Sequence, residues 1–286
     1  MTGSAPVPIR SPLPLEPAAR ARAIVAHSDA MTPSTTLFRI ADEIQGGSLS
    51  AAQLARHVEA SPALAARVLR VANSGFYAPL QSVSTLPRAI AVLGDVVVRQ
   101  LVLASIVAAR RTRLRSLHQS AVAARLTADA VRCAVASRAL AQLVHMDADA
   151  AFAGGLLHDL GRIYLLEESG DTYADLSIAR GAHVPLQDES ELCGATHEDV
   201  GAVLADEWDL PPVIAQALRA HHRPEPASVA QLVHVADGLV TQLIHAGGAG
   251  ETVSAPVAVL GIDEATWAER VPFVRREMER LLYLFD

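Results

Sequence analysis

A histidine and an aspartate, His158 and Asp159, stand side by side in an otherwise apolar run that begins at Gly154. An imidazole and a carboxylate at adjacent positions can face one cation, so this pair could form half of a metal site. In a purely structural alternative, Asp159 caps a helix or pairs locally, and His158 is a hydrogen-bonded histidine of the core. The dipeptide alone leaves both interpretations open.

Further polar groups stand in or beside apolar segments later in the chain: His197, His221, His222 and Asp237. With the first pair they form four clusters on four expected helices. Imidazole and carboxylate ligands suit iron, manganese, zinc or nickel, and six such groups would suffice for two adjacent metals bridged by a carboxylate. Two metals so placed would activate a water and stabilise phosphoryl charge, as phosphoester hydrolysis requires. The alternative is a hydrogen-bonded core in which Asp159 orients His158 or His222.

The composition predicts an all-α fold that positions these groups. Hydrophobic residues make up 51% of the 286 residues and aromatic residues only 4%, and alanine, leucine and valine dominate, which favours packed helices over sheets. We expect a long alanine-rich helix first, a buried helix that leads into the His-Asp pair, a helix capped by Thr196, and three further helices. Their expected ranges are 121–144, 148–157, 197–205, 213–220, 228–245 and 263–286.

Composition also excludes several functions. All 24 basic residues are arginine, so Schiff-base chemistry and lysine-dependent phosphate loops are excluded. The net charge of -7 gives no broad attraction to nucleic acid, and the one local cluster, from Arg110 to Arg115, is better explained as a solvated helix end. Cys133 and Cys193 are too few for a disulfide framework and are interpreted as small core residues, which fits a reducing cytoplasm.

The longest apolar stretch, 89–109, contains Asp95 and Arg99, so we expect no membrane span and a soluble, cytoplasmic protein. A separate polar segment, Asn73-Ser74-Gly75, follows the end of a packed helix that begins at Ser61-Pro62. Asn73 can bond the carbonyls freed at that helix end. A ligand or partner contact in the groove between the two halves of the chain is the functional alternative.

The segment from Ser61 to Ser74 resembles the hallmark of the bacterial HDOD family, and the stretches 82–85, 89–94 and 98–103 resemble its following helices in order and spacing. The resemblance implies bacterial signalling by a non-catalytic regulatory or adaptor module that binds a partner protein or small ligand. Such a partner would belong to two-component or cyclic-dinucleotide pathways. The expected layout is a flexible proline-rich arm (1–16), an N-terminal helical bundle (17–112), a degenerate HD-like helical domain (113–250) and a C-terminal helix packed on that domain (251–286).

Residues 115–245 resemble the larger HD phosphohydrolase superfamily and its HD-GYP branch. That resemblance implies one metal on His158, Asp159 and Asp237, a second metal on His197, His221 and His222, and Asp159 as the bridge and as the catalytic residue if the site is active.

The superfamily needs one more histidine upstream, and an ungapped comparison places that position near Asp129. His118 lies too early and His145 too late. The comparison could be shifted by one helical turn, or Asp129 could ligate as a carboxylate, but the simplest interpretation is a damaged first site. The sequence therefore predicts a regulatory protein, with a metal-dependent phosphohydrolase of a nucleotide or cyclic dinucleotide as the alternative.

Overall fold

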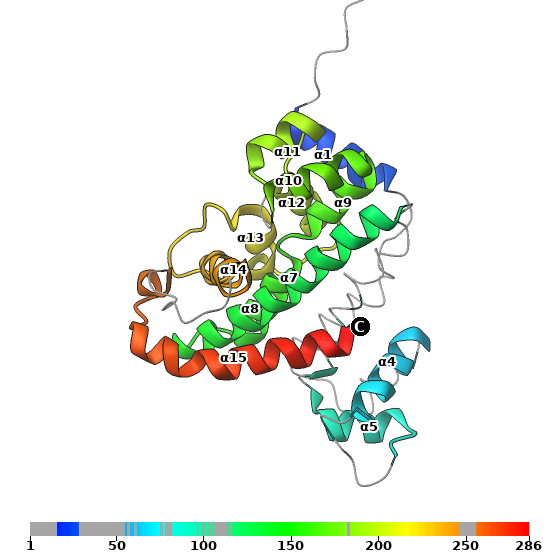
Figure 1. Ribbon diagram of the computed structural model, residues 1–286, viewed down its shortest axis with the longest axis vertical. Helices are drawn as coiled ribbons and strands as arrows, with labels where there is room; N and C mark the ends of the chain where they lie inside the picture. The colour runs from blue at the N-terminus through cyan, green and yellow to red at the C-terminus, as the bar shows by residue number, and fades with distance from the viewer. Residues whose placement is uncertain are drawn as a thin grey trace, which may run out of the picture.

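The computed structural model describes residues 16–28, 55, 58–59, 62–74, 77, 82–95, 97–98, 101–102, 105, 114, 116–181, 184–245 and 256–285. Every regular element in these ranges is helical, which confirms the all-α fold. Figure 1 shows the long helix α7 running through the centre, with α1 and α9 to α12 toward one end and α4 and α5 toward the other. None of the described helices is long and apolar enough to cross a membrane.

The helix α7 (Leu117–Leu143) forms the spine of the fold. Ser116 caps it, since its hydroxyl accepts a hydrogen bond from the Gln119 amide, and its alanines present a smooth surface to its neighbours. It packs against α8 (Ala148–Leu157), α14 (Val229–His245) and α15 (Glu264–Phe285). A Cβ at Gly155 would lie 2.8 Å from Ala134 Cα, so α8 reaches α7 at a distance that only glycine permits.

Helix α9 (Leu160–Ser169) begins directly after the His-Asp pair and packs on α12 (His197–Glu207). Thr196 caps α12 in a reciprocal capping box with Asp199, as the sequence predicts for the Thr196 cap. Helix α13 (Pro212–Ala220) follows and packs between α8, α12 and α14. Helices α8 and α13 therefore both contact α14, and α12 contacts α13, so the elements that carry the candidate residues are packed together.

Two helices were not expected from the sequence, α10 (Asp171–Arg180) and α11 (Leu186–Cys193). Their sequences are rich in polar residues and show no clear apolar stripe, so periodicity does not reveal them. Helix α1 (Pro17–His27) packs on α9 and α12, where Arg20 pairs with Glu168 at 2.9 Å. This helix thus adjoins elements of the expected HD-like domain.

The N-terminal part contains α4 (Pro62–Ala72) and α5 (Leu86–Leu93), which pack on each other. Asn73 joins them: its Nδ2 donates to the carbonyls of Leu69 and Val83, both at 2.8 Å, and its Oδ1 accepts from the Val83 amide at 2.7 Å. These bonds confirm that Asn73 satisfies carbonyls at the helix end.

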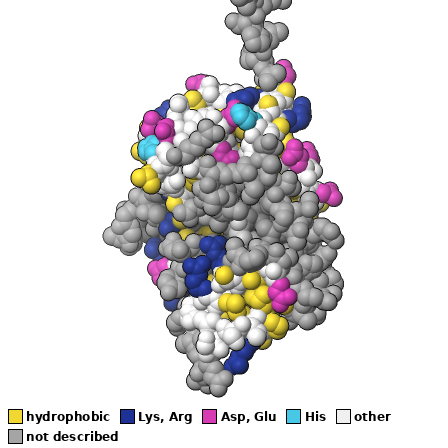
Figure 2. Space-filling model, turned by 90° about the vertical axis from the view of Figure 1, so that its right-hand side faces the viewer, with side chains coloured by type: hydrophobic (Ala, Val, Ile, Leu, Met, Phe, Trp, Pro, Cys, Tyr) yellow, Lys and Arg dark blue, Asp and Glu magenta, His cyan; other side chains and the backbone are white. Residues whose placement is uncertain are grey.

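Two expectations fall outside the described residues: the arm at 1–15, and all four arginines of the cluster from Arg110 to Arg115. A short 3₁₀ helix, η2 (Pro256–Leu260), precedes α15. On the face shown in Figure 2, acidic and basic side chains both occur over the described surface, and hydrophobic side chains gather toward its lower end. The described part of this face is therefore not of a single charge.

Candidate metal centre

The six residues singled out in the sequence converge on one place. His158 is the C-cap of α8 and Asp159 follows it before α9; His197 opens α12; His221 and His222 follow α13; and Asp237 lies in α14. Ligand atoms of His158, Asp159 and His221 lie within 4.8 Å of one another. The same holds for His197, His221 and His222. Side chains from separate helices therefore face a common interior.

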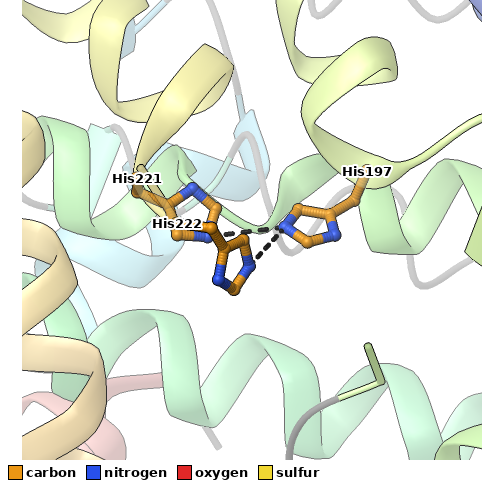
Figure 3. Close-up of side chains that lie close together, drawn as sticks. All are labelled: His197, His221 and His222. Carbon is orange, nitrogen blue, oxygen red and sulfur yellow. Dashed lines mark hydrogen bonds between the residues drawn. The ribbon is translucent and has the colours of Figure 1, made fainter. Parts of the chain in front are cut away.

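His197, His221 and His222 form what we call the three-histidine group. The Nε2 atom of His197 lies 3.4 Å from Nε2 of His221 and 3.2 Å from Nε2 of His222. In Figure 3, His221 and His222 leave the end of α13 and point toward His197 at the start of α12. Three ring nitrogens that approach one another this closely are arranged as they would be around one cation.

Hydrogen bonds on the opposite ring nitrogens orient these side chains. Nδ1 of His197 donates to Glu189 Oε2 at 2.6 Å, and Nδ1 of His221 donates to the Ala217 carbonyl at 2.9 Å. Nδ1 of His158 likewise donates to the Gly155 carbonyl at 2.8 Å. Each acceptor fixes the proton on Nδ1 and leaves Nε2 facing the interior, which is the usual arrangement of metal-binding histidines.

A second set of ligand atoms, which we call the cysteine group, consists of Cys133, His158 and Asp237, all within 4.8 Å of one another. Cys133 is fully buried on α7, and His158 Nε2 lies 3.7 Å from Asp237 Oδ1. The sequence predicts Cys133 only as a small residue of the core. It lies one helical turn beyond Asp129, in the register that a one-turn shift leaves open.

Asp159 lies between the two groups. Its Oδ1 is 3.3 Å from His197 Nε2 and 3.6 Å from His221 Nε2, and its Oδ2 is 3.6 Å from His158 Nε2. These distances exceed ordinary hydrogen bonds, so the carboxylate faces both groups without closing on either. Its position is the one from which a bridging ligand would act.

Asp129 does not join these ligands. Its carboxylate pairs with Arg132 at 2.7 Å on the same helix, and none of the candidate ligand groups within the described ranges includes it. The α7 residue that does face the centre is Cys133.

A buried network that the sequence analysis missed surrounds Asp159. Arg162 is 1% exposed, and its guanidinium lies 2.9 Å from Asp159 Oδ1 and 3.2 Å from Glu189 Oε1. Tyr173 donates to the same Glu189 oxygen at 2.8 Å. No sequence motif predicts this network, because the partners come from α9, α10 and α11 and only packing brings them together.

The charges of this network set the protonation of its acids. Burial by itself would raise the pKa of Asp159, but Arg162 and the neighbouring histidines outweigh burial and hold that pKa well below its usual value. For Glu189 too, burial favours a higher pKa, yet His197 and Arg162 outweigh it and lower the pKa. Both carboxyl groups are therefore anionic and suited to face cations.

The pKa values of the histidines and of the thiol do not all shift in the same direction. Burial lowers the pKa of His221 well below its usual value and that of His222 to about 4, so both rings are neutral. For His158, burial acts in the same direction but Asp159 outweighs it and raises the pKa. Burial raises the pKa of Cys133. A metal entering the centre would thus displace protons from His158 and Cys133.

The chain matches one protein-family model and is similar to several solved structures. The sequence model of the HDOD domain matches residues 31–224. No curated protein matches the chain. An HDOD domain protein of unknown function from Geobacter sulfurreducens has a similar structure, with a TM-score of 0.73 and 22% identity over 94% of this chain and 98% of that one.

Two further solved structures are similar. One, a candidate phosphohydrolase from Shewanella amazonensis, has a TM-score of 0.70 and 20% identity over 94% of this chain and 98% of that one. The other, a candidate signal transduction protein from Marinobacter aquaeolei, has a TM-score of 0.69 and 21% identity over 95% of this chain and 67% of that one. At these identities the likeness establishes the fold.

Proposed function

We propose that this chain, which belongs to the HDOD family, is a regulatory module of bacterial signal transduction that binds a partner protein or small ligand instead of turning over a substrate. Its gathered ligands would hold a divalent ion such as iron, manganese, zinc or nickel. We propose the cytoplasm as its location and a two-component or cyclic-dinucleotide pathway as the source of its partner. The description of the Marinobacter structure as a candidate signalling protein supports this proposal.

The ion pair between Arg162 and Asp159 is the observation that carries the proposal. A carboxylate that bridges two cations must share its negative charge between them. Here a buried guanidinium 2.9 Å from Asp159 Oδ1 already offsets that charge and weakens the ability of Asp159 to bridge them. Without two metals that share Asp159 as a bridge, the centre lacks the clamp that stabilises both attacking and leaving oxygens of a phosphoester.

The burial of the centre supports the same conclusion. His158, His197 and His221 are at most 2% exposed. The other three members of the set, Asp159, Asp237 and His222, are partly exposed. The side chains of the two aspartates are 13% and 15% exposed. A centre closed in this way is suited to hold structure, whereas hydrolysis requires room for a phosphoester and an attacking water.

All six ligands come from the expected HD-like domain at 113–250, and we retain its division from the bundle at 17–112 as a proposal. The contact of α1 with α9 and α12 ties the beginning of the chain to the helices that carry Asp159 and His197. A ligand that shifts α1 would therefore act close to the centre.

A metal-dependent phosphohydrolase is the second candidate, and the convergence of all six predicted ligands favours it. In that case Asp159 would be the catalytic bridge, and the metals would supply an activated water. Asp129 cannot fill the upstream position assigned to it by the ungapped comparison while it pairs with Arg132 as observed.

The test is to purify the protein without chelator, measure its metal content and assay hydrolysis of a nucleotide and a cyclic dinucleotide with added manganese or iron. We expect no turnover that depends on Asp159. The matched control for Asp159→Ala is Asp175→Ala, whose side chain is 77% exposed. Stoichiometric metal together with turnover that Asp159→Ala abolishes and Asp175→Ala preserves would overturn the regulatory proposal.

A further inference from the structure

Cys133 occupies an unusual place for a cysteine of the core. It is fully buried on α7, and its sulfur lies within 4.8 Å of ligand atoms of His158 and Asp237. Its hydrogen-bond contacts are long: 3.8 Å from Sγ to the Val233 carbonyl and 3.9 Å to Ser137 Oγ. The thiol therefore gains little from these neighbours, although it lies beside two groups that bind metals well.

An independent observation at His158 points to a ligand in the same place. Nε2 of this ring is buried, and the nearest carboxylate oxygens, on Asp159 and Asp237, lie 3.6 and 3.7 Å away, beyond ordinary hydrogen-bond length. The ring cannot easily turn away, because Nδ1 is held by the Gly155 carbonyl at 2.8 Å. A cation between His158, Asp237 and the sulfur would give Nε2 a partner at bonding distance.

We propose that Cys133 is a thiolate ligand that binds one metal ion together with His158 and Asp237. The inference rests on the proposed metal centre but not on the absence of turnover. The thiol proton, and any proton on His158 Nε2, leave to solvent as the metal enters, and no oxidation or reduction is involved.

Sulfur changes which metal the centre prefers. A thiolate is a soft ligand and favours zinc, ferrous iron or cobalt, whereas manganese and magnesium prefer sets made only of oxygen and nitrogen. Zinc bonds to sulfur at about 2.3 Å and to imidazole nitrogen at about 2.0–2.1 Å, so the side chains would close slightly around it. The cysteine group thus gives its half of the centre a selectivity that the three-histidine group lacks.

Cobalt substitution tests the sulfur bond directly, without an activity assay. Metal-free full-length protein is titrated with Co²⁺, and its absorption is recorded. We expect visible cobalt bands together with a sulfur-to-cobalt charge-transfer band in the near ultraviolet. Cys133→Ser should lose the charge-transfer band and should lower the preference for zinc over manganese by at least about 10-fold.

The control is Cys193→Ser, which removes the other buried thiol, located on α11 and in contact with Ser169. This variant should keep the band. If Cys133→Ser fails to fold, Cys133→His supplies an imidazole from the same position and should bind cobalt without the band.

The outcomes separate the two proposals. Cobalt bound by the wild type without a sulfur band, or a band that persists in Cys133→Ser or Cys133→His, would overturn the role of Cys133 and leave the metal centre standing. Failure of the wild type to bind cobalt or zinc at all would overturn both the thiolate ligand and the metal centre. Neither result depends on hydrolysis, which the assay with Asp159→Ala addresses separately.

Discussion

The two halves of the centre are built differently. The three-histidine group comes from one short stretch of chain, where the start of α12 meets the end of α13. The cysteine group comes from α7, the end of α8 and the middle of α14, which are far apart in sequence. The first is assembled by a local helix pair, and the second by the packing of long helices. Local assembly is visible in a sequence, whereas a long-range assembly depends on how each helix is rotated.

The halves also differ in how their ligands are supported. His197 is held by a charged acceptor, since Nδ1 donates to the buried carboxylate of Glu189 at 2.6 Å. His158 is held by the neutral carbonyl of Gly155, and its own neighbours are the thiol and Asp237. A carboxylate behind a histidine strengthens the ligand more than a carbonyl does. Variants can therefore affect one half and spare the other.

The largest effect is expected from Gly161→Ala, which breaks the three-histidine half. A Cβ at this position would lie 2.2 Å from the His197 carbonyl oxygen, so α9 and the first turn of α12 must separate. We expect a loss of about 3 kcal/mol or more in the free energy of unfolding, measured by urea denaturation without metal. Gly238→Ala is the control, because a Cβ there meets nothing within 4 Å; it should be neutral or stabilise by up to about 1 kcal/mol. Equal stability of Gly161→Ala and wild type would contradict the close packing.

Glu189→Gln sharpens the comparison at the level of metal affinity. Glutamine can still accept the His197 proton but lacks the charge, so we expect affinity for zinc to fall about 10–100-fold in a chelator competition. The sulfur-to-cobalt band should remain, because Glu189 supports only the three-histidine half. Glu191→Gln, two residues later on α11 and exposed, should leave affinity unchanged. Loss of the sulfur band in Glu189→Gln would show that the halves are not separable.

The dependence of stability on pH in acid should report on His222, the most exposed histidine of the three-histidine group. Burial lowers the pKa of His222 from 6.5 to about 4. In acid the unfolded chain binds a proton that the folded chain refuses, so stability falls as pH decreases from 6.5 to about 4. The full shift is worth up to ~3 kcal/mol, and partial exposure of the ring reduces this to about 1–2 kcal/mol.

The measurement compares wild type and His222→Gln in urea at several pH values, with chelator present. The stability difference between them should change by about 1–2 kcal/mol across this window, with the wild type losing more in acid. The control is His27→Gln, at a histidine whose side chain is 80% exposed. A difference between wild type and His222→Gln that is constant with pH would refute the burial argument.

The sequence pointed to the residues of the three-histidine half but not to the buried charged residues behind them, Glu189 and Arg162. The range 148–157 matches α8 and Thr196 caps α12, because capping residues and apolar runs are local signals. Glu189 was missed because α11 has no apolar stripe, so nothing marks one of its carboxylates as fully buried. Arg162 was missed because burial of a guanidinium depends on partners from other helices, which the sequence does not show.

The cysteine half exposes a different limit. The ungapped comparison places the upstream position near Asp129 and leaves open a shift of one helical turn, and Cys133 lies one turn further along the same helix, α7. Residues four apart lie on the same face of α7, so periodicity cannot choose between Asp129 and Cys133. The choice follows from where α8 and α14 cross α7, and that crossing is set by packing contacts such as Gly155 on Ala134.

Asp129→Ala is the smallest expected effect and decides between those two positions. The Asp129 carboxylate pairs with Arg132 near the surface, with side chains 20% and 24% exposed, and such pairs contribute about 0–1 kcal/mol. Alanine also favours the helix slightly more than aspartate, which offsets part of the loss. We therefore expect the free energy of unfolding to change by less than about 1 kcal/mol. Cobalt affinity and the sulfur band should match the wild type. Because Cys133→Ser removes the band from the next turn of the same helix, the two variants measured side by side assign the upstream ligand. A loss of cobalt affinity in Asp129→Ala, with none in Cys133→Ser, would assign it to the carboxylate instead.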